Sequence, residues 1–146
     1  VRERMKRRDQ RRLAMQALFA LEFNPTAVQD AIRAVAEEYG SLDKQSGEYL
    51  LSLVSGIWEA REELDEQIAP YTTEWAIERI FDVDRILCRM ALYEIYISKN
   101  PLAPGIAINE AVELAKEFGA DESPRFINGI LGAVVRARGE VIVKAE

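Results

Sequence analysis

The most constraining feature of this sequence is the spacing of its apolar residues, which follows the 3.6-residue period of an α-helix in every strong segment. In residues 14–21 the apolar positions fall at i, i+3, i+4 and i+7, and the pattern ends at Asn24-Pro25. A second pattern ends at Gly40, and a third, longer one covers residues 50–68 as a single helix. Such a chain buries helix faces against one another rather than the alternating faces of strands.

The second half of the chain has the same character. We expect a short element over residues 72–81, then a helix over 83–98 that Asp82 could cap, and a helix over 108–118 that ends before Gly119. In the last helix Ser123 is expected as the N-cap and Pro124 at the first helical position. The tail after residue 138 fits either a strand or a frayed helix. The connections are short and no linker divides the chain. The sequence therefore predicts an all-α fold of about seven helices, with residues 1–146 in a single domain.

Composition limits the function. Charged residues make up 30% and hydrophobic residues 49% of the chain, no apolar run approaches about 20 residues, and no secretory signal is visible. The single Cys88 excludes an internal disulfide, so we expect a cytoplasmic protein. The absence of histidine removes Ser–His and Cys–His pairs and the HExxH zinc motif. We therefore expect no catalysis, metal or cofactor.

The net charge of −6 hides a strong asymmetry. Residues 1–12 hold seven basic and two acidic side chains, a net charge of +5. Residues 13–146 hold 12 basic and 23 acidic side chains, a net charge of −11. A basic N-terminal arm over residues 1–12 on an acidic body suggests two partners of opposite charge.

A helical wheel gives this basic segment a direction. At about 100° per residue, four of the arginines fall within an arc of about 100° beside the apolar face. This arc contains Arg4, Arg8, Arg11 and Arg12. It continues into Met15 and Phe19 and is bordered by Gln16. Arginines neutralise phosphates, an aromatic ring stacks a base, and an amide pairs with a base edge. The stripe therefore predicts a single-stranded nucleic-acid surface.

Other interpretations of the stripe remain open. A basic N-terminal tail can be merely solvated or bind without specificity. Phe19 can pack beneath a neighbouring helix instead of stacking a base. A membrane-surface helix is disfavoured because the apolar stripe is mostly alanine and is needed for the core. An organelle transit peptide is disfavoured by Glu3 and Asp9.

Four segments of the chain together resemble the NusB family of bacterial transcription antitermination factors. They read RRLAMQALF, DRILCRMALYEIY, AINEAVELAKEFG and PRFINGILGAV, in that order, and the resemblance covers about residues 7–138. The resemblance implies two three-helix bundles packed across each other and no catalysis. Asn109 and Asn128, within these segments, are expected near helix–helix contacts, and Gly129 is expected to allow a close approach of two backbones.

The resemblance also implies partners. Members of this family bind the single-stranded boxA element of ribosomal RNA leader transcripts through an arginine-rich N-terminus. They pair with NusE, a protein of the small ribosomal subunit, and join the antitermination complex of RNA polymerase during rRNA synthesis. Two alternatives stay open at this point. One is a homodimeric protein-interaction module whose RNA surface is masked, and the other is the RNA-binding domain of an RNA methyltransferase.

The resemblance assigns candidate residues by position. The RNA-binding segment at the N-terminus matches Arg7, Arg8, Arg11, Gln16 and Phe19, with phenylalanine where tyrosine is usual. A second RNA-facing stretch matches Glu122, Arg125 and Phe126, with Pro124 where some relatives are polar. The NusE-binding segment matches Glu78 and Asp84, whose acidity suits a basic ribosomal partner.

Overall fold

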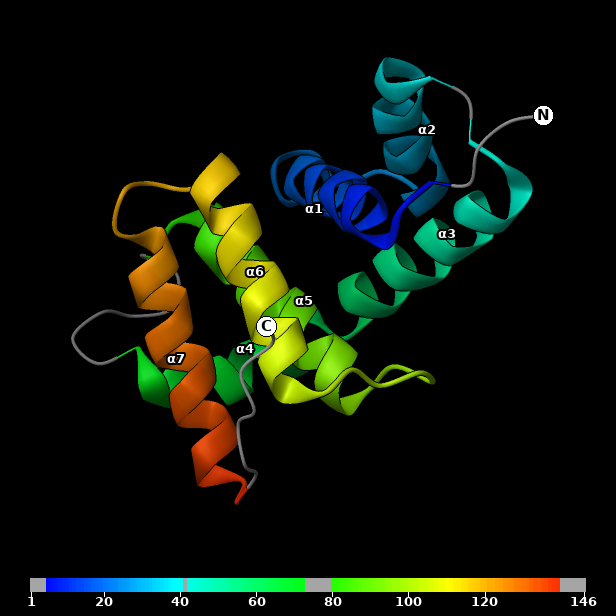
Figure 1. Cartoon of the computed structure of the whole chain (residues 1–146). Helices are drawn as coiled ribbons and strands as arrows, with labels where there is room; N and C mark the ends of the chain where they lie inside the picture. Colours follow the sequence, from blue (N-terminus) through cyan, green and yellow to red (C-terminus); the bar gives the residue numbers. More distant parts are fainter. Residues whose placement is uncertain (1–4, 41, 73–79, 140–146) are drawn as a thin grey trace. The chain divides into compact units, whose positions relative to one another are not determined.

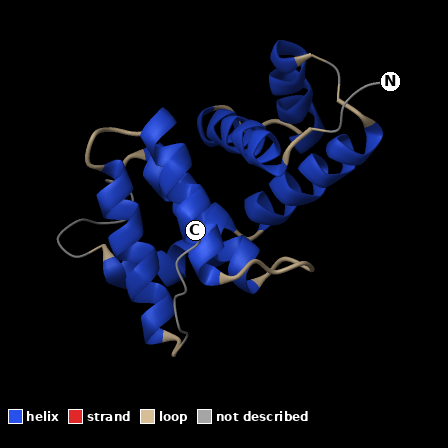
Figure 2. Ribbon diagram, in the orientation of Figure 1, coloured by secondary structure: helices blue, strands red, loops and turns tan. Residues whose placement is uncertain are grey.

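The computed structural model describes residues 5–40, 42–72 and 80–139 of the chain, and these residues form helices joined by short loops (Figures 1 and 2). In chain order the elements are α1 (Arg7–Phe23), α2 (Val28–Tyr39), α3 (Lys44–Glu59), α4 (Arg61–Ile68), the 3₁₀ turn η1 (Ala69–Tyr71), α5 (Asp82–Tyr96), α6 (Pro104–Phe118) and α7 (Ser123–Ala137). The described residues contain seven α-helices and no strand, so the predicted all-α class is confirmed.

The chain divides into two compact units, residues 1–59 and 60–146. In the first unit α1, α2 and α3 contact one another around fully buried side chains that include Leu21, Leu50 and Ile57. In the second unit α5, α6 and α7 form a mutually contacting set around Leu87 and Leu131, and α4 packs against α5 and α7. Each unit therefore contains a three-helix bundle, as the family resemblance implies.

The prediction of a single helix over residues 50–68 is wrong, because the helix is interrupted at Ala60. This residue has φ −90° and ψ 4°, outside the α-helical region, and α4 starts at the next residue. The apolar side chains before the break, such as Ile57, belong to the first unit, and Leu64 and Ile68 belong to the second. Both halves keep an apolar face, so the period continues through the break and conceals it.

Helix starts differ slightly from the sequence expectation. α5 begins at Asp82, which was expected to cap it, and α7 begins at Ser123, with Pro124 next. The Ser123 Oγ accepts a hydrogen bond of 2.9 Å from the Ala120 N–H and so holds the loop before α7. Most of the expected short element over residues 72–81 and the tail from residue 140 lie outside the described residues. Among the described helices, none combines the length and apolarity needed to cross a membrane.

Candidate nucleic-acid interface

The basic segment is largely part of a helix rather than an arm. α1 begins at Arg7, so the cationic side chains from Arg7 to Arg12 lie on its first turns. Within the predicted basic arm over residues 1–12, the residues from Arg7 onward are therefore helical and continue into the rest of α1. Arg4 lies outside the described residues.

A chain of hydrogen bonds joins the start of α1 to the start of α3. Arg7 Nη1 donates to Gln10 Oε1 at 2.5 Å, and Gln10 Nε2 donates to Ser46 Oγ at 2.8 Å. The Ser46 N–H donates to Asp43 Oδ2 at 3.0 Å, and hydrogen bonds from the Ser46 side chain and backbone lower the pKa of Asp43. The Arg7 guanidinium also lies 3.6 Å from the ring centroid of Tyr49. These contacts fix the direction in which α1 presents its first turns.

The side chains of the predicted stripe differ in exposure. Arg8 is exposed, and Arg12 is half-buried with its Nη1 2.5 Å from Asp9 Oδ1. Gln16 is half-buried. Arg11 is 8% exposed, so its stem and most of its guanidinium pack into the first unit.

The prediction that Met15 extends the stripe is wrong. Met15 is 2% exposed and belongs to the core, together with the predicted core residues Ala14, Ala17 and Leu18. Because α1 contacts both α2 and α3, its buried face is wider than the alanine-rich stripe alone. The exposed part of the stripe is correspondingly narrower than the wheel suggested.

The exposed stripe ends in two aromatic rings rather than one. Phe19 is 36% exposed and Phe23 is 65% exposed. Their ring centroids are 4.8 Å apart and the ring planes are inclined by 57°. Phe23 was missed in the sequence because the wheel stopped at Phe19, although one more turn places Phe23 on the same side.

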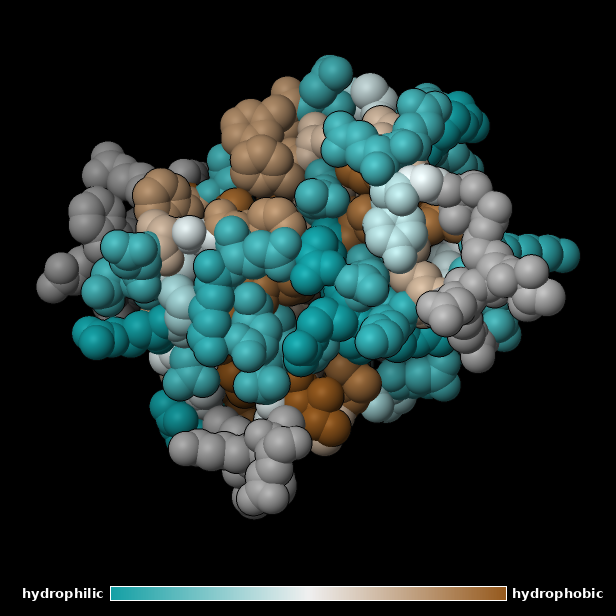
Figure 3. All heavy atoms as spheres, turned by 45° about the horizontal axis from the view of Figure 1, so that its top comes forward, coloured by the Kyte–Doolittle hydropathy of each residue, from teal (hydrophilic) through white to brown (hydrophobic). Residues whose placement is uncertain are grey.

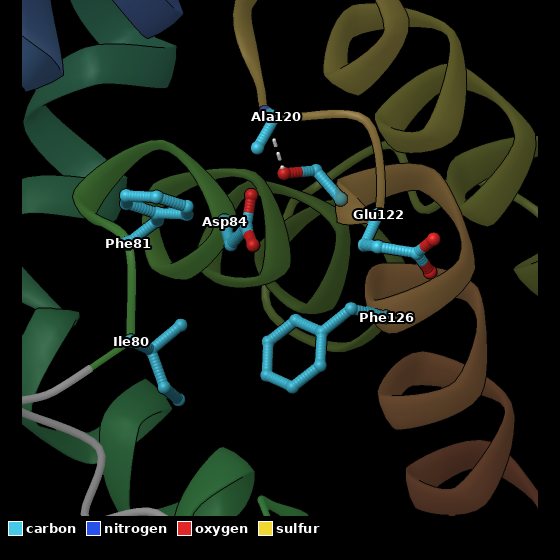
Figure 4. Close-up of a pocket in the computed structure, with 7 residues that line it drawn as sticks. Ile80, Phe81, Asp84, Ala120, Glu122 and Phe126 are labelled. Carbon is cyan, nitrogen blue, oxygen red and sulfur yellow. Dashed lines mark hydrogen bonds between the residues drawn. The ribbon is translucent and has the colours of Figure 1, made fainter.

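The second predicted RNA-facing stretch lies at the start of α7, in the second unit. Glu122 and Arg125 are exposed, with 3.7 Å between a carboxylate oxygen and a guanidinium nitrogen, whereas Phe126 is half-buried. Glu122 and Phe126 line a pocket of about 280 Å³, and Asp84 from α5 lies in the same pocket (Figure 4). The remaining lining residues are Ile80, Phe81, Ala120 and Ser123. The structure thus brings Asp84, which was predicted to bind NusE, beside Glu122 and Phe126, which were predicted to bind RNA.

The pocket places a buried carboxylate among apolar side chains. In Figure 4 Ile80 and Phe126 face each other, and Asp84 lies between Phe81 and Glu122. Asp84 is 4% exposed, and its Oδ1 has no hydrogen-bond partner. Burial raises the pKa of Asp84, although a hydrogen bond from Ser123 partly offsets this effect. An unsatisfied carboxylate oxygen at an open pocket is suited to a donor from a partner, above all a cationic one.

Close packing holds the loop before α7 in place. A Cβ added to Gly119 would lie 2.6 Å from the Ser123 Cβ and 2.9 Å from the Ala115 carbonyl oxygen. Gly119 therefore allows Ser123 to reach both the Ala120 N–H and the Asp84 carboxyl.

Three expectations about positions within the family segments are wrong. Asn109 on α6 and Asn128 on α7 are exposed rather than placed at helix contacts. Gly129 is exposed, and an added Cβ would meet no atom within 4 Å. Glu78, the other predicted NusE-binding residue, lies outside the described residues.

Comparison with known proteins identifies the family of the chain. The NusB family pattern matches residues 8–136, which include all but the first residue of α1 and all but the last residue of α7. The chain belongs to the NusB family. It is 45% identical over 139 residues to the transcription antitermination protein NusB of Symbiobacterium thermophilum, and the match covers 90% of each chain. It is 36% identical over 130 residues to the protein of the same name from Bacillus subtilis, covering 89% of this chain and 95% of the relative.

Solved structures agree with this assignment. NusB from T. maritima has a TM-score of 0.82 at 30% identity, covering 92% of this chain and 93% of that one. A chain of the crystal structure of antitermination factors NusB and NusE in complex with dsRNA has a TM-score of 0.77 at 26% identity. The match covers 90% of this chain and 96% of that one.

Proposed function

We propose that this chain is a transcription antitermination factor that binds boxA-containing single-stranded RNA of rRNA leader transcripts together with NusE. The bound RNA is thereby linked to the elongating RNA polymerase. The observation that carries this proposal is the family match over residues 8–136, which spans both the cationic face of α1 and the pocket at the start of α7.

The proposed RNA surface has two parts. On α1 the contacting side chains are Arg8, Arg12, Gln16 and Phe19, in addition to Arg4 at the N-terminus. In the second unit they are Glu122, Arg125 and Phe126. Arg7 and Arg11 add positive charge close to the bound RNA, although the Arg7 guanidinium lies over the Tyr49 ring and Arg11 is packed into the first unit. Arginine suits this task because its guanidinium pairs with phosphate oxygens in a bidentate manner and also stacks.

The proposed NusE contact uses acidic side chains, Glu78 and Asp84. Asp84 supports this proposal because its Oδ1 is buried without a hydrogen-bond partner beside an open pocket. A lysine, arginine or histidine from a basic ribosomal protein would satisfy that oxygen and neutralise its charge. Binding of RNA and partner requires no cofactor and no catalytic step, and we expect the protein to act in the cytoplasm.

A fluorescence titration tests the RNA part of the proposal. The purified chain is titrated with labelled boxA-containing single-stranded RNA, with a scrambled strand and with a duplex, each in the presence and absence of NusE. If about four to five phosphates are neutralised, log K falls against log[salt] with a slope of about −3. Replacing Arg8 by Ala should make that slope about 0.7 less negative. A salt-independent affinity, or equal affinity for all three nucleic acids, contradicts the proposal.

The partner and assembly state are tested in the same samples. NusE should tighten the binding of boxA RNA, and Asp84→Ala should remove that gain without weakening RNA binding by the chain alone. Light scattering reports whether the chain is a monomer or a homodimer. A stable homodimer that ignores both RNA and NusE would favour the protein-interaction module instead.

A further inference from the structure

Among the described residues of the first unit, the most exposed large apolar side chain is that of Phe23. Phe23 is 65% exposed at the last position of α1, whereas the neighbouring Leu21 is fully buried. Figure 3 shows apolar side chains gathered in patches between hydrophilic ones on one face of the molecule. The Phe23 ring contributes little to the core of the first unit, and with the adjacent Phe19 ring it forms an exposed apolar pair.

Phe23 continues the cationic stripe in register. Counted from Arg8 at about 100° per residue, Arg12, Gln16, Phe19 and Phe23 all fall within an arc of about 80°. The stripe is about 22 Å long at 1.5 Å per residue. At about 3.4 Å per nucleotide, as in one strand of a duplex, that length accommodates roughly six stacked nucleotides. One strand can therefore meet the guanidinium groups at one end and the aromatic rings at the other.

The two rings are already arranged for contact. A centroid distance of 4.8 Å and an inclination of 57° correspond to a tilted aromatic pair, in which each ring restricts the other. No base fits between rings that touch, so a base would stack on an outer face of the pair. Because the pair is preorganised, less side-chain entropy is lost when a base binds.

We infer that Phe23 and Phe19 together form a base-stacking surface at the end of the cationic stripe, and that Phe23 is an RNA-contact residue. This inference rests on the proposed RNA-binding function. The occupant is a base of a single-stranded RNA, since the same helix face carries Arg8 and Arg12, and phosphates follow each base in a strand. A purely apolar protein partner would have no use for the guanidinium groups in line with the rings.

Phe23→Ala tests the inference, with Tyr39→Ala as the matched control. Tyr39 is 51% exposed at the end of α2 in the same unit and does not belong to the stripe. We expect Phe23→Ala to weaken binding of boxA-containing single-stranded RNA about five- to tenfold, the lower end of the range for one stacked base, with an unchanged salt slope. Tyr39→Ala should bind like wild type, and Phe23→Trp should restore the affinity.

Abasic RNA separates stacking from a structural role. A series of RNA strands, each with one base removed, should contain a position where the wild type loses affinity and Phe23→Ala loses nothing further. Equal affinity of Phe23→Ala and wild type overturns the inference. So does a loss that is the same for every abasic strand, or a change in dimerisation without a change in RNA binding. If the wild-type chain binds no RNA, the proposed function itself fails, which is a different result from failure of Phe23 alone.

Discussion

Replacing Asp84 by Asn should raise the stability of the folded protein at neutral pH. Asp84 is 4% exposed, its Oδ1 has no hydrogen-bond partner, and burial raises the pKa of its carboxyl group. A buried polar group left unsatisfied costs about 1–3 kcal/mol. The lower end applies here because Ser123 donates to the carboxyl and the pocket is open. Asparagine keeps an acceptor oxygen for Ser123 and carries no charge to desolvate.

We therefore expect Asp84→Asn to raise the free energy of unfolding at neutral pH by up to about 1 kcal/mol, a rise in Tm of about 3 °C for a chain of this size. The pH dependence has a definite sign. A carboxyl whose pKa is raised by folding stabilises the protein fully below its unfolded pKa, near 3.8, and this stabilisation is lost as pH rises through the raised value. The advantage of the variant should accordingly vanish in acid and reach its full value at neutral pH.

Asp82→Asn is the matched control, measured by the same thermal and urea unfolding. Asp82 lies in the same first turn of α5, but it is 2.7 Å from Arg85 and its side chain is 36% exposed. Its replacement removes a charged partner of Arg85, whose side chain is only 11% exposed, and a favourable charge at a helix N-terminus, so stability should fall by about 1–3 kcal/mol. If Asp84→Asn is less stable than wild type at neutral pH, or if its effect does not change with pH, the proposed desolvation of Asp84 is refuted.

Three further predictions concern packing and polar contacts, each measured by urea unfolding. Gln10→Leu should lower the free energy of unfolding by about 1–3 kcal/mol because it leaves Ser46 without the Gln10 donor; an unchanged value would contradict the role of this hydrogen-bond chain. Asp65→Ala should lower the free energy of unfolding by about 3 kcal/mol, because Arg89, whose side chain is 7% exposed, donates to both Asp65 oxygens at 2.6 Å. Glu62→Ala on the same helix should change the free energy of unfolding little. Gly119→Ala should lower the free energy of unfolding by about 1–3 kcal/mol, because the new Cβ overlaps Ser123. Gly129→Ala, whose new Cβ would lie in open space, should leave the free energy of unfolding unchanged or raise it.

Much of the local structure could be read from the sequence. The apolar period gave the ends of α1 and α2 to within a residue or two, and it correctly placed Ala14, Ala17 and Leu18 in the core. It missed the break at Ala60, because both sides of the break keep an apolar face toward a core. It also misplaced Met15 and Arg11, since a wheel shows direction but not how many neighbouring helices cover a face.

The candidate site likewise separates what sequence order determines from what helix packing determines. The sequence by itself determined the helical class, the family and the charge asymmetry, because periodicity, motif order and net charge depend only on which residues follow one another. The tertiary structure alone decided that Asp84 from α5 meets Glu122 and Phe126 from α7, and that Gln10 reaches Ser46 across 36 residues. These contacts depend on how helices distant in the chain pack together, and packing is set by the fit of whole helix faces, which no local pattern records.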